Sequence, residues 1–246
     1  MMDVQVEVST RCNFDCFYCA GRDMAQGDMP LERFRAIVDR HVARYGVPRR
    51  LSLQGEGEPT LNRDFFAMAA YARTIGAEPF TITNGTYKYP EHFLADFRQI
   101  GVSIDTLDAC EAASIGRHNL ERVIEFVENL RGRLDITIFS VAVSASVQPV
   151  REWCRKRGLR HMIQPLQGKD DYSRRYPQRI QLHRQPTEYR CHLLENDGMR
   201  YYDLSGGEMP CCFIKDASRF ESIAALRSIL EERKVPLPCA GCAHLR

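Results

Sequence analysis

The sequence predicts an α/β protein: a partial (β/α)6 parallel barrel with a small C-terminal extension made of a hairpin and a helix. Strand and helix patterns alternate about six times before residue 167, which is typical of parallel sheets covered by helices. The first four strands each carry a polar face. Strands buried on both faces are usually continuous apolar runs, so the polar faces favour a curved barrel with a wet lumen.

Strands are predicted where apolar and polar residues alternate or where β-branched residues run together. In chain order these strands cover residues 4–8, 51–54, 80–83, 102–105, 136–143 and 162–166. The polar positions that would face the lumen are Gln5 and Glu7, Ser52 and Gln54, Thr81 and Thr83, and Ser103 and Asp105.

Helices are predicted between the strands, where apolar residues recur at helical spacing. The stripes cover residues 31–45, 93–100 and 120–130, and a further helix is expected over 149–158.

The chain changes character near Gly168. Residues 168–190 are polar and irregular, which predicts a linker or lid. A hairpin is expected next, with strands over 192–195 and 199–204 joined by a turn at 196–198. A short helix over 221–232 follows. We therefore divide the chain into a barrel (1–167), a linker or lid (168–190) and a C-terminal extension (191–246).

The composition predicts a cytoplasmic protein. No apolar run is long enough to cross a membrane, and the N-terminus has no basic segment followed by an apolar one. The net charge is only +2, yet residues 151–190 hold eleven basic and four acidic residues. Such a stretch suits an acidic partner, and a solvated basic face explains it equally well.

Three cysteines, Cys12, Cys16 and Cys19, directly follow the first predicted strand. Thiolates suit iron–sulfur clusters. Clusters that only transfer electrons are usually held by four cysteines, so three would leave one iron open to an outside ligand. We therefore expect a cluster that binds another molecule at iron.

The C-x3-C-x2-C spacing resembles that of the radical S-adenosylmethionine (SAM) superfamily. Gly57, Glu58 and Pro59 end the second strand and match the superfamily's Gly-Gly-Glu-Pro motif, although Glu56 replaces the preceding glycine. The resemblance runs over residues 4–167 in strand order. It implies that the following residues contact the cofactor: Tyr18, Gly55, Gly57, Glu58, Pro59, Asn84, Ser103, Asp105 and Gln164.

The resemblance also implies a mechanism. Cys12, Cys16 and Cys19 would hold a [4Fe–4S] cluster whose open iron binds SAM. One electron would then release methionine and a 5′-deoxyadenosyl radical, which takes a hydrogen atom from a substrate. An acidic electron donor such as flavodoxin or ferredoxin is the implied partner.

A second cysteine set lies in the extension. Cys239 and Cys242 form a metal-type CxxC pair, and with Cys191 and Cys211 they suffice for an auxiliary [4Fe–4S] cluster. The spacing does not decide between Cys211 and its neighbour Cys212, and a structural zinc site remains the alternative. The arrangement resembles the SPASM/twitch extensions of radical SAM enzymes, and the layout is similar to the twitch dehydrogenase of butirosin biosynthesis.

Three functions fit these features. We expect oxidation or epimerisation of a polar small molecule of the carbohydrate or aminocyclitol class, and Cys110 is a candidate hydrogen-atom donor for epimerisation. The second is modification of a ribosomally made peptide, by a crosslink or an epimerised residue. Against it, the first strand begins by Val4 and leaves no room for a preceding leader-binding domain. The third is a zinc-stabilised module that binds nucleic acid through its basic stretch.

Overall fold

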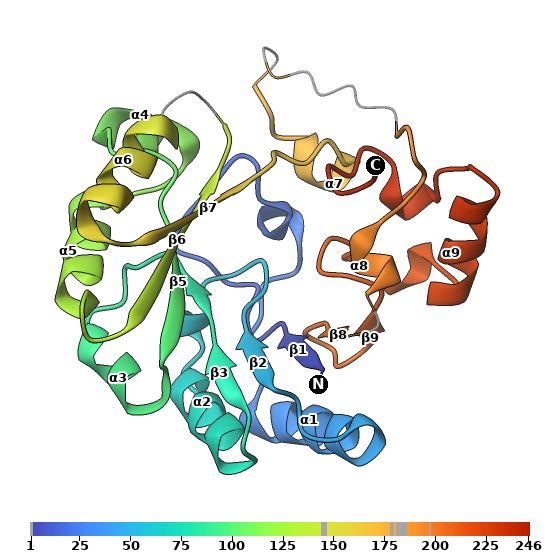
Figure 1. Cartoon of the computed structure of the whole chain (residues 1–246), viewed down its shortest axis with the longest axis horizontal. Helices are drawn as coiled ribbons and strands as arrows, with labels where there is room; N and C mark the ends of the chain where they lie inside the picture. The colour runs from blue at the N-terminus through green and yellow to red at the C-terminus, as the bar shows by residue number, and fades with distance from the viewer. Residues whose placement is uncertain (1, 144–146, 178–179, 181–185, 197) are drawn as a thin grey trace.

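The computed structural model describes residues 2–143, 147–177, 180, 186–196 and 198–246. Its parallel strands curve into a partial barrel, as the sequence predicts (Figure 1). The strands that form the barrel are β1 (Asp3–Val6), β2 (Arg50–Leu53), β3 (Glu78–Phe80), β4 (Ile82–Thr83), β5 (Gln99–Ser103), β6 (Asp135–Val141) and β7 (Arg160–Gln164).

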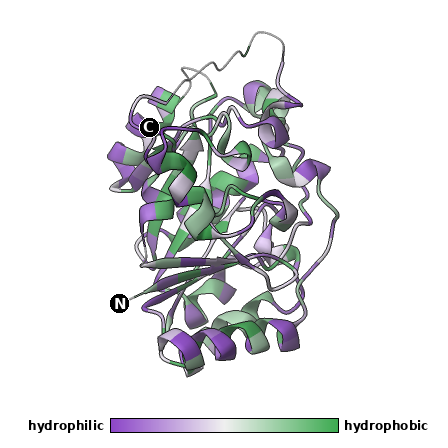
Figure 2. Cartoon of the chain, turned by 90° about the vertical axis from the view of Figure 1, so that its right-hand side faces the viewer, coloured by the Kyte–Doolittle hydropathy of each residue, from purple (hydrophilic) through white to green (hydrophobic). Residues whose placement is uncertain are grey.

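Helices cover the outer face of this sheet (Figure 1). They are α1 (Leu31–Tyr45), α2 (Phe65–Thr74), α3 (Phe93–Asp96), α4 (Ala109–Ile115), α5 (Leu120–Leu130) and α6 (Val147–Arg157). In α1, Phe34, Ile37 and Val38 are buried while the opposite face meets solvent. Figure 2 shows the resulting mixture of hydrophobic and hydrophilic residues along this helix, at the bottom of the view. The helix ends at Gly46, whose positive φ of 85° suits glycine.

The predicted third strand is split at Thr81. β3 pairs with β2, whereas β4 pairs with β5, so the barrel consists of two sheets in the orders β3-β2-β1-β8-β9 and β4-β5-β6-β7. Thr81 joins them: its hydroxyl donates to the Leu53 carbonyl (2.7 Å), and its own carbonyl accepts from Gly101 N (2.8 Å). The barrel therefore continues across the break without a free edge at that point.

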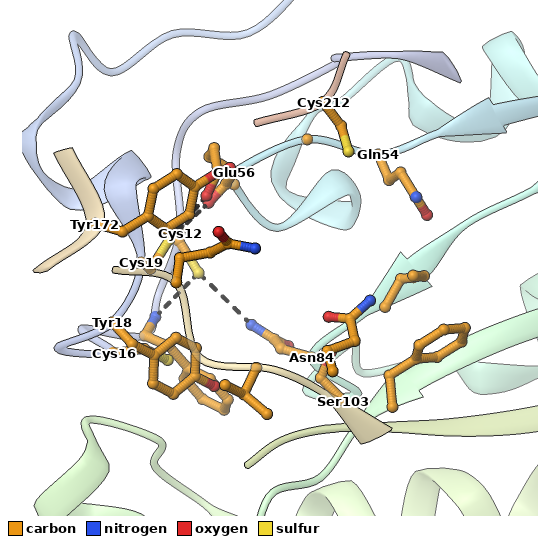
Figure 3. Close-up of a pocket in the computed structure, with 18 of the residues that line it drawn as sticks. Cys12, Cys16, Tyr18, Cys19, Gln54, Glu56, Asn84, Ser103, Tyr172 and Cys212 are labelled. Atoms are coloured by element: carbon orange, nitrogen blue, oxygen red, sulfur yellow. Dashed lines mark hydrogen bonds between the residues drawn. The ribbon is translucent and has the colours of Figure 1, made fainter. Parts of the chain in front are cut away.

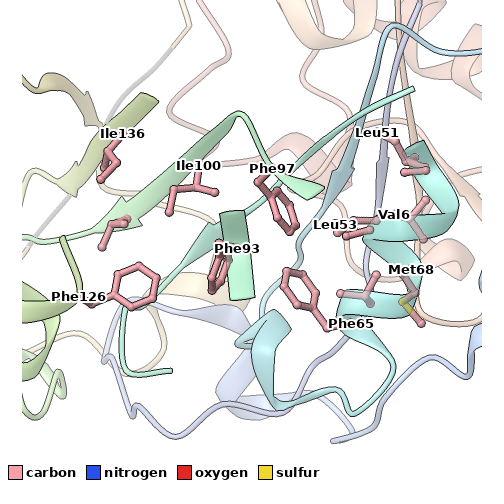
Figure 4. Close-up of a cluster of buried hydrophobic side chains, with 14 of the residues drawn as sticks. Val6, Leu51, Leu53, Phe65, Met68, Phe93, Phe97, Ile100, Phe126 and Ile136 are labelled. Atoms are coloured by element: carbon pink, nitrogen blue, oxygen red, sulfur yellow. The ribbon is translucent and has the colours of Figure 1, made fainter. Parts of the chain in front are cut away.

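The main core lies between the strands and the helices (Figure 4). Phe65 stacks on Phe97 with ring centres 5.7 Å apart, and Phe93 meets Phe126 edge-on at 5.4 Å. The helix predicted over 93–100 is too long: α3 ends at Asp96 and Ile100 lies in β5. Phe97 is already extended where it caps α3, so the apolar spacing of this segment comes from a helix followed by a strand.

The C-terminal part begins with α7 (Asp170–Ser173) and α8 (His192–Glu195), and continues with β8 (Met199–Tyr202), β9 (Glu208–Met209) and α9 (Ile223–Glu231). The predicted hairpin is misplaced. Residues 192–195 form a helix, Asp197 of the predicted turn lies outside the described residues, and the hairpin is β8–β9, turning through 203–207. The helix predicted over 221–232 is confirmed as α9.

β8 also joins the barrel sheet, pairing in parallel with β1. Short 3-10 helices complete the chain: η1 (Ala20–Asp23), η2 (Pro59–Leu61), η3 (Pro90–His92), η4 (Ala217–Arg219) and η5 (Leu237–Cys239). A second, smaller group of buried side chains lies entirely within residues 191–245. Across the described ranges, no helix combines the length and the apolar composition needed to cross a bilayer.

Candidate active site

A cavity of about 270 Å³ opens at the carboxyl ends of the barrel strands. Loops after β1, β2, β4, β5 and β7 line it, as parallel barrels usually arrange their sites. Its wall also includes Tyr172 of α7 and, from the C-terminal part, Cys212, Phe213, Lys215 and His244. Residues of the barrel, of α7 and of the extension therefore line one cavity.

Cys12, Cys16 and Cys19 all line this cavity (Figure 3). Their loop is tied to the end of α4, because Asp15 N and Phe17 N donate to the carbonyls of Gly116 (2.9 Å) and Ile115 (3.1 Å). Burial raises the pKa of each of the three thiols. Without a metal they stay protonated, so ligation and loss of the thiol proton would occur together.

The glycines of the second loop pack against the first loop. A β-carbon on Gly57 would lie 2.5 Å from the Ser9 carbonyl oxygen, and one on Gly55 would lie 2.3 Å from the Glu7 side chain. We expected these glycines to admit a ligand. They line the cavity, yet the close approach that demands glycine is to β1 and its loop.

Glu58 is buried and ties the second loop to the third. Its carboxylate accepts from Thr83 Oγ1 (2.7 Å), Asn84 N (2.6 Å) and the Thr60 hydroxyl (2.7 Å). Burial raises the pKa of Glu58, partly offset by these hydrogen bonds. Asn84 in turn points its amide at Cys12 Sγ, 4.0 Å away (Figure 3). The carboxylate thus orders the loops around the cysteines.

Tyr18 and Asp105 meet in a buried network with Arg117, a residue that the sequence did not single out. Arg117 Nε lies 2.6 Å from Asp105 Oδ2, and Arg117 Nη2 donates to the Tyr18 hydroxyl (2.6 Å). The Tyr18 hydroxyl donates to Asp105, which also accepts from Val141 N (2.8 Å). Asp105 is therefore fully engaged with protein groups, while Tyr18 and Arg117 reach the cavity wall.

Of the remaining candidate site residues, some line the cavity and others do not. Ser103 and Gln164 line the cavity. Pro59 is buried at the start of η2 and does not line it. Cys110 is exposed on α4, also away from the cavity wall. Its hydrogen-donor role stays a prediction that this placement does not support.

The second cysteine set comes together in the extension. Cys191, Cys211 and Cys239 are buried, and Cys242 is partly buried. Burial raises the pKa of Cys239 to about 12 and that of Cys242 to about 11, and the thiols of Cys211 and Cys191 add to both shifts. Cys191, Cys211 and Cys239 belong to one group of buried side chains, and Cys242 packs against it.

Lys169 lies beside this set. It is 2% exposed, donates to the Phe213 carbonyl, and its charge lowers the pKa of Cys211, Cys239 and Cys242 against the effect of burial. A buried cation stabilises thiolate ligands, so the surroundings suit a site with anionic sulfurs.

Cys212 faces the other way from its neighbour Cys211: it lines the cavity together with Cys19 and Glu56 (Figure 3). This arrangement favours Cys211 over Cys212 as the fourth member of the second set. Sequence spacing could not separate adjacent residues.

The donor chemistry of both sets fits iron–sulfur clusters, since each gathers thiols beside a basic residue. However, no group of three or more His, Cys, Asp or Glu side chains in the described part of the chain is placed so that it could hold a single metal ion. Cys12, Cys16 and Cys19 would hold the cluster in the cavity, and Cys191, Cys211, Cys239 and Cys242 the one in the extension.

Comparison with known families decides the class. The radical SAM superfamily model matches residues 6–146, which include the first cysteine set and strands β2 to β6. The chain belongs to the radical SAM superfamily. This assignment supports an enzyme rather than the non-catalytic module of the third interpretation, and nucleic-acid binding by the basic stretch stays a prediction. A [4Fe–4S] cluster and SAM are the cofactors of the family.

Radical SAM relatives resemble the chain over different lengths. An S-adenosylmethionine-dependent nucleotide dehydratase of Selenomonas ruminantium is 28% identical over 129 residues, covering 50% of this chain and 46% of the relative. The chain thus spans about half the length of this curated relative.

Solved structures match nearly the whole chain. Streptococcus suis SuiB bound to S-adenosylmethionine has a TM-score of 0.71 at 14% identity, covering 97% of this chain and 67% of SuiB. SuiB has also been solved with its precursor peptide SuiA. BtrN in complex with AdoMet and 2-DOIA has a TM-score of 0.55 at 13% identity, covering 94% and 87%. These likenesses establish a shared fold, including the C-terminal part.

Proposed function

We propose that this radical SAM enzyme takes a hydrogen atom from a polar small molecule of the carbohydrate or aminocyclitol class and completes its oxidation with an auxiliary [4Fe–4S] cluster. When loaded, the first cluster supplies the electron that splits SAM into methionine and a 5′-deoxyadenosyl radical. Cys12, Cys16 and Cys19 would hold that cluster at the cavity, and the barrel would shield the radical from solvent.

The shared cavity carries the proposal. Cys12, Cys16 and Cys19 line it from the barrel, and Cys212 lines it from the extension. Cys212 directly follows Cys211 in the chain, and Cys211 is a member of the second set. This connection between the second set and the cavity wall supports a role for an auxiliary cluster as electron acceptor from a substrate in the cavity.

The electron count fits an alcohol oxidation. The substrate would lose one hydrogen atom to the radical, one electron to the auxiliary cluster and one proton to solvent or a nearby base. In total it loses two protons and two electrons. An alcohol carbon would become a ketone. Epimerisation would instead return a hydrogen atom to the same carbon, with Cys110 as the candidate donor.

The polar groups of the cavity suit an uncharged or weakly charged substrate. Its two cations are already paired, Arg117 with Asp105 and Lys215 with Glu56. The side-chain amide oxygen of Gln54 is buried and has no hydrogen-bond partner among the described residues, and Ser103 also lines the wall. Hydroxyl groups of a sugar or cyclitol can satisfy such amides and hydroxyls.

Two other substrate classes stay open to the same test. The SuiB likeness makes a ribosomal peptide the second candidate, since SuiB has been solved with a precursor peptide and its fold spans 99% of this chain. A nucleotide is suggested by the name of the dehydratase relative. That match covers half of the chain.

The electron donor is proposed to be an acidic flavodoxin or ferredoxin. Exposed basic residues of α6, Arg151, Arg155 and Lys156, lie in the basic stretch. Arg155 and Lys156 are balanced in part by Glu152, at 2.7 and 3.7 Å. Arg179 and Arg184 of the stretch lie outside the described residues. A donor that docks here should bind more weakly as salt rises.

Anaerobic reconstitution tests the function. The full chain, supplied with iron and sulfide, is expected to bind about eight irons, as two [4Fe–4S] clusters require. On reduction with SAM it should release 5′-deoxyadenosine, and an aminocyclitol or sugar panel should raise this release and yield a ketone. The same panel includes the two alternative substrate classes, a nucleotide (GTP) and ribosomal precursor-type peptides. Turnover of only a nucleotide or a peptide would contradict the proposed substrate class.

Two sets of variants separate the clusters. Cys12→Ala, Cys16→Ala and Cys19→Ala should each abolish 5′-deoxyadenosine formation. Cys239→Ala with Cys242→Ala should lower the iron count to about four and spare SAM cleavage, since one cubane remains. Unchanged iron would remove the auxiliary cluster, and four irons with one zinc in the parent protein would replace it by a zinc site.

A further inference from the structure

Glu56 places a carboxylate beside a ligand of the first cluster. Its Oε2 lies 3.4 Å from Cys19 Sγ, and its carbonyl oxygen lies 3.5 Å from the same sulfur. The side chain is only 13% exposed. A glycine stands at this position in the motif that the sequence resembles, so the carboxylate is a feature of this chain.

Lys215 neutralises that carboxylate from the extension. Its Nζ lies 2.6 Å from Glu56 Oε1, and both side chains are 13% exposed. The Tyr172 hydroxyl donates to the same oxygen at 2.6 Å. One barrel residue is thereby held by one residue of α7 and one of the extension, next to Cys19 (Figure 3).

The contacts themselves indicate that both groups are charged. A carboxylate and an ammonium group lie 2.6 Å apart, each 13% exposed, and each stabilises the charged form of the other. The Tyr172 hydroxyl adds a hydrogen bond to the carboxylate. Salt screens such enclosed charges weakly.

We propose that Glu56 and Lys215 are positioning residues that together set the reduction potential of the cluster held by Cys12, Cys16 and Cys19. Cluster potentials depend on local net charge, hydrogen bonds to sulfur and exposure. A carboxylate beside Cys19 opposes the arrival of an electron, and the ammonium group of Lys215 cancels that effect. The inference rests on the proposed function only in requiring that the first cluster assembles.

The proposal predicts that substitutions of Glu56 and of Lys215 shift the midpoint potential of the first cluster in opposite directions. Glu56→Gln removes the negative charge and keeps the shape, so the midpoint potential of the first cluster should rise. Lys215→Met leaves the carboxylate uncompensated, so the potential should fall. The double variant should lie between them. Loss of a purely structural contact would give no such reversal of sign.

Potentiometric titration of the reconstituted full chain, followed by the electron paramagnetic resonance signal that changes on adding SAM, measures this midpoint without turnover. Lys234→Met is the matched control, because Lys234 is exposed and pairs only with Glu232 at 2.8 Å among the described residues. Lys215→Arg keeps the charge, so its midpoint potential should lie close to that of the parent protein.

Iron counts and circular dichroism confirm that each variant is folded and loaded; if Lys215→Met fails to load, Glu56→Gln and Lys215→Arg carry the test. Shifts of the same sign in Glu56→Gln and Lys215→Met, or a Glu56→Gln potential equal to that of the parent protein, would overturn the proposal. A parent protein with no SAM-responsive cluster would instead contradict the proposed function.

Discussion

At the scale of single residues, the network of Tyr18, Asp105 and Arg117 places a buried ion pair in the barrel. The Asp105 side chain is 0% exposed and that of Arg117 is 13% exposed. Burial opposes the charged form of Arg117, while Asp105 and Tyr18 raise its pKa well above the usual value. The network fixes Tyr18 at the cavity wall.

Arg117→Met should therefore destabilise the fold strongly. Removing one partner of a buried ion pair leaves an uncompensated charge and costs about 3–5 kcal/mol of unfolding free energy. Urea denaturation measures this loss. Arg155→Met provides the comparison, since Arg155 pairs with Glu152 on the surface and should change stability little. Equal effects of the two variants would show that the Arg117 network contributes no more than a surface pair.

At the scale of elements, the loops after β1 and β2 are interlocked. Gly57 N donates to the Ser9 carbonyl (3.1 Å) and Glu58 N to the Arg11 carbonyl (2.7 Å). The first loop carries the three cysteines, so the second loop supports its shape. Gly21 makes a comparable contact, since a β-carbon there would lie 2.6 Å from Glu56 Cβ.

Gly57→Ala should consequently impair both stability and cluster loading. The added methyl group would lie 2.4 Å from the Arg11 carbonyl oxygen, so the backbone must shift. Overpacking of this kind costs about 1–3 kcal/mol. Iron content after reconstitution and urea unfolding are the measurements. Gly207→Ala is the control, because the atoms nearest to its β-carbon belong to the Asp203 side chain, at an ordinary 3.4 Å. Full iron content in Gly57→Ala would show that the loop contact is dispensable.

At the scale of the whole molecule, the buried side chains form a large group and a small group. The larger lies between the barrel strands and the helices that cover them, and the smaller lies within 191–245 and includes Cys191, Cys211 and Cys239. A small module with a limited core commonly depends on a metal for stability. Pairing of β8 with β1 attaches this part to the barrel. The division of the chain at residues 167 and 191 stays a prediction.

Loading of the extension should stabilise it selectively, because metal binding to a folded site adds to folding free energy. Hydrogen exchange is expected to slow within 191–245 after reconstitution, while β5 and β6 of the barrel change little. Cys239→Ala with Cys242→Ala should abolish the slowing. Equal protection with and without reconstitution would show that the small core is stable unaided.

The sequence by itself determined the alternation of strands and helices, the polar lumen and the cysteine triplet, because these depend on local periodicity and spacing. The structure confirms the barrel and brings Cys12, Cys16 and Cys19 to one cavity. Glu56 was visible as a departure from a motif, although its partner was not. Helix 93–100 was overestimated, because apolar spacing continued from a helix into a strand.

Only the tertiary structure decided the contacts between distant segments. β8 pairs with β1 across nearly 200 residues, Lys215 reaches Glu56, and Arg117 lies between Tyr18 and Asp105. Cys211 and Cys212 are adjacent in sequence, yet one joins the second cysteine set and the other faces the cavity. Local patterns encode which face of an element is buried, whereas the pairing of buried charges depends on how complete elements pack together.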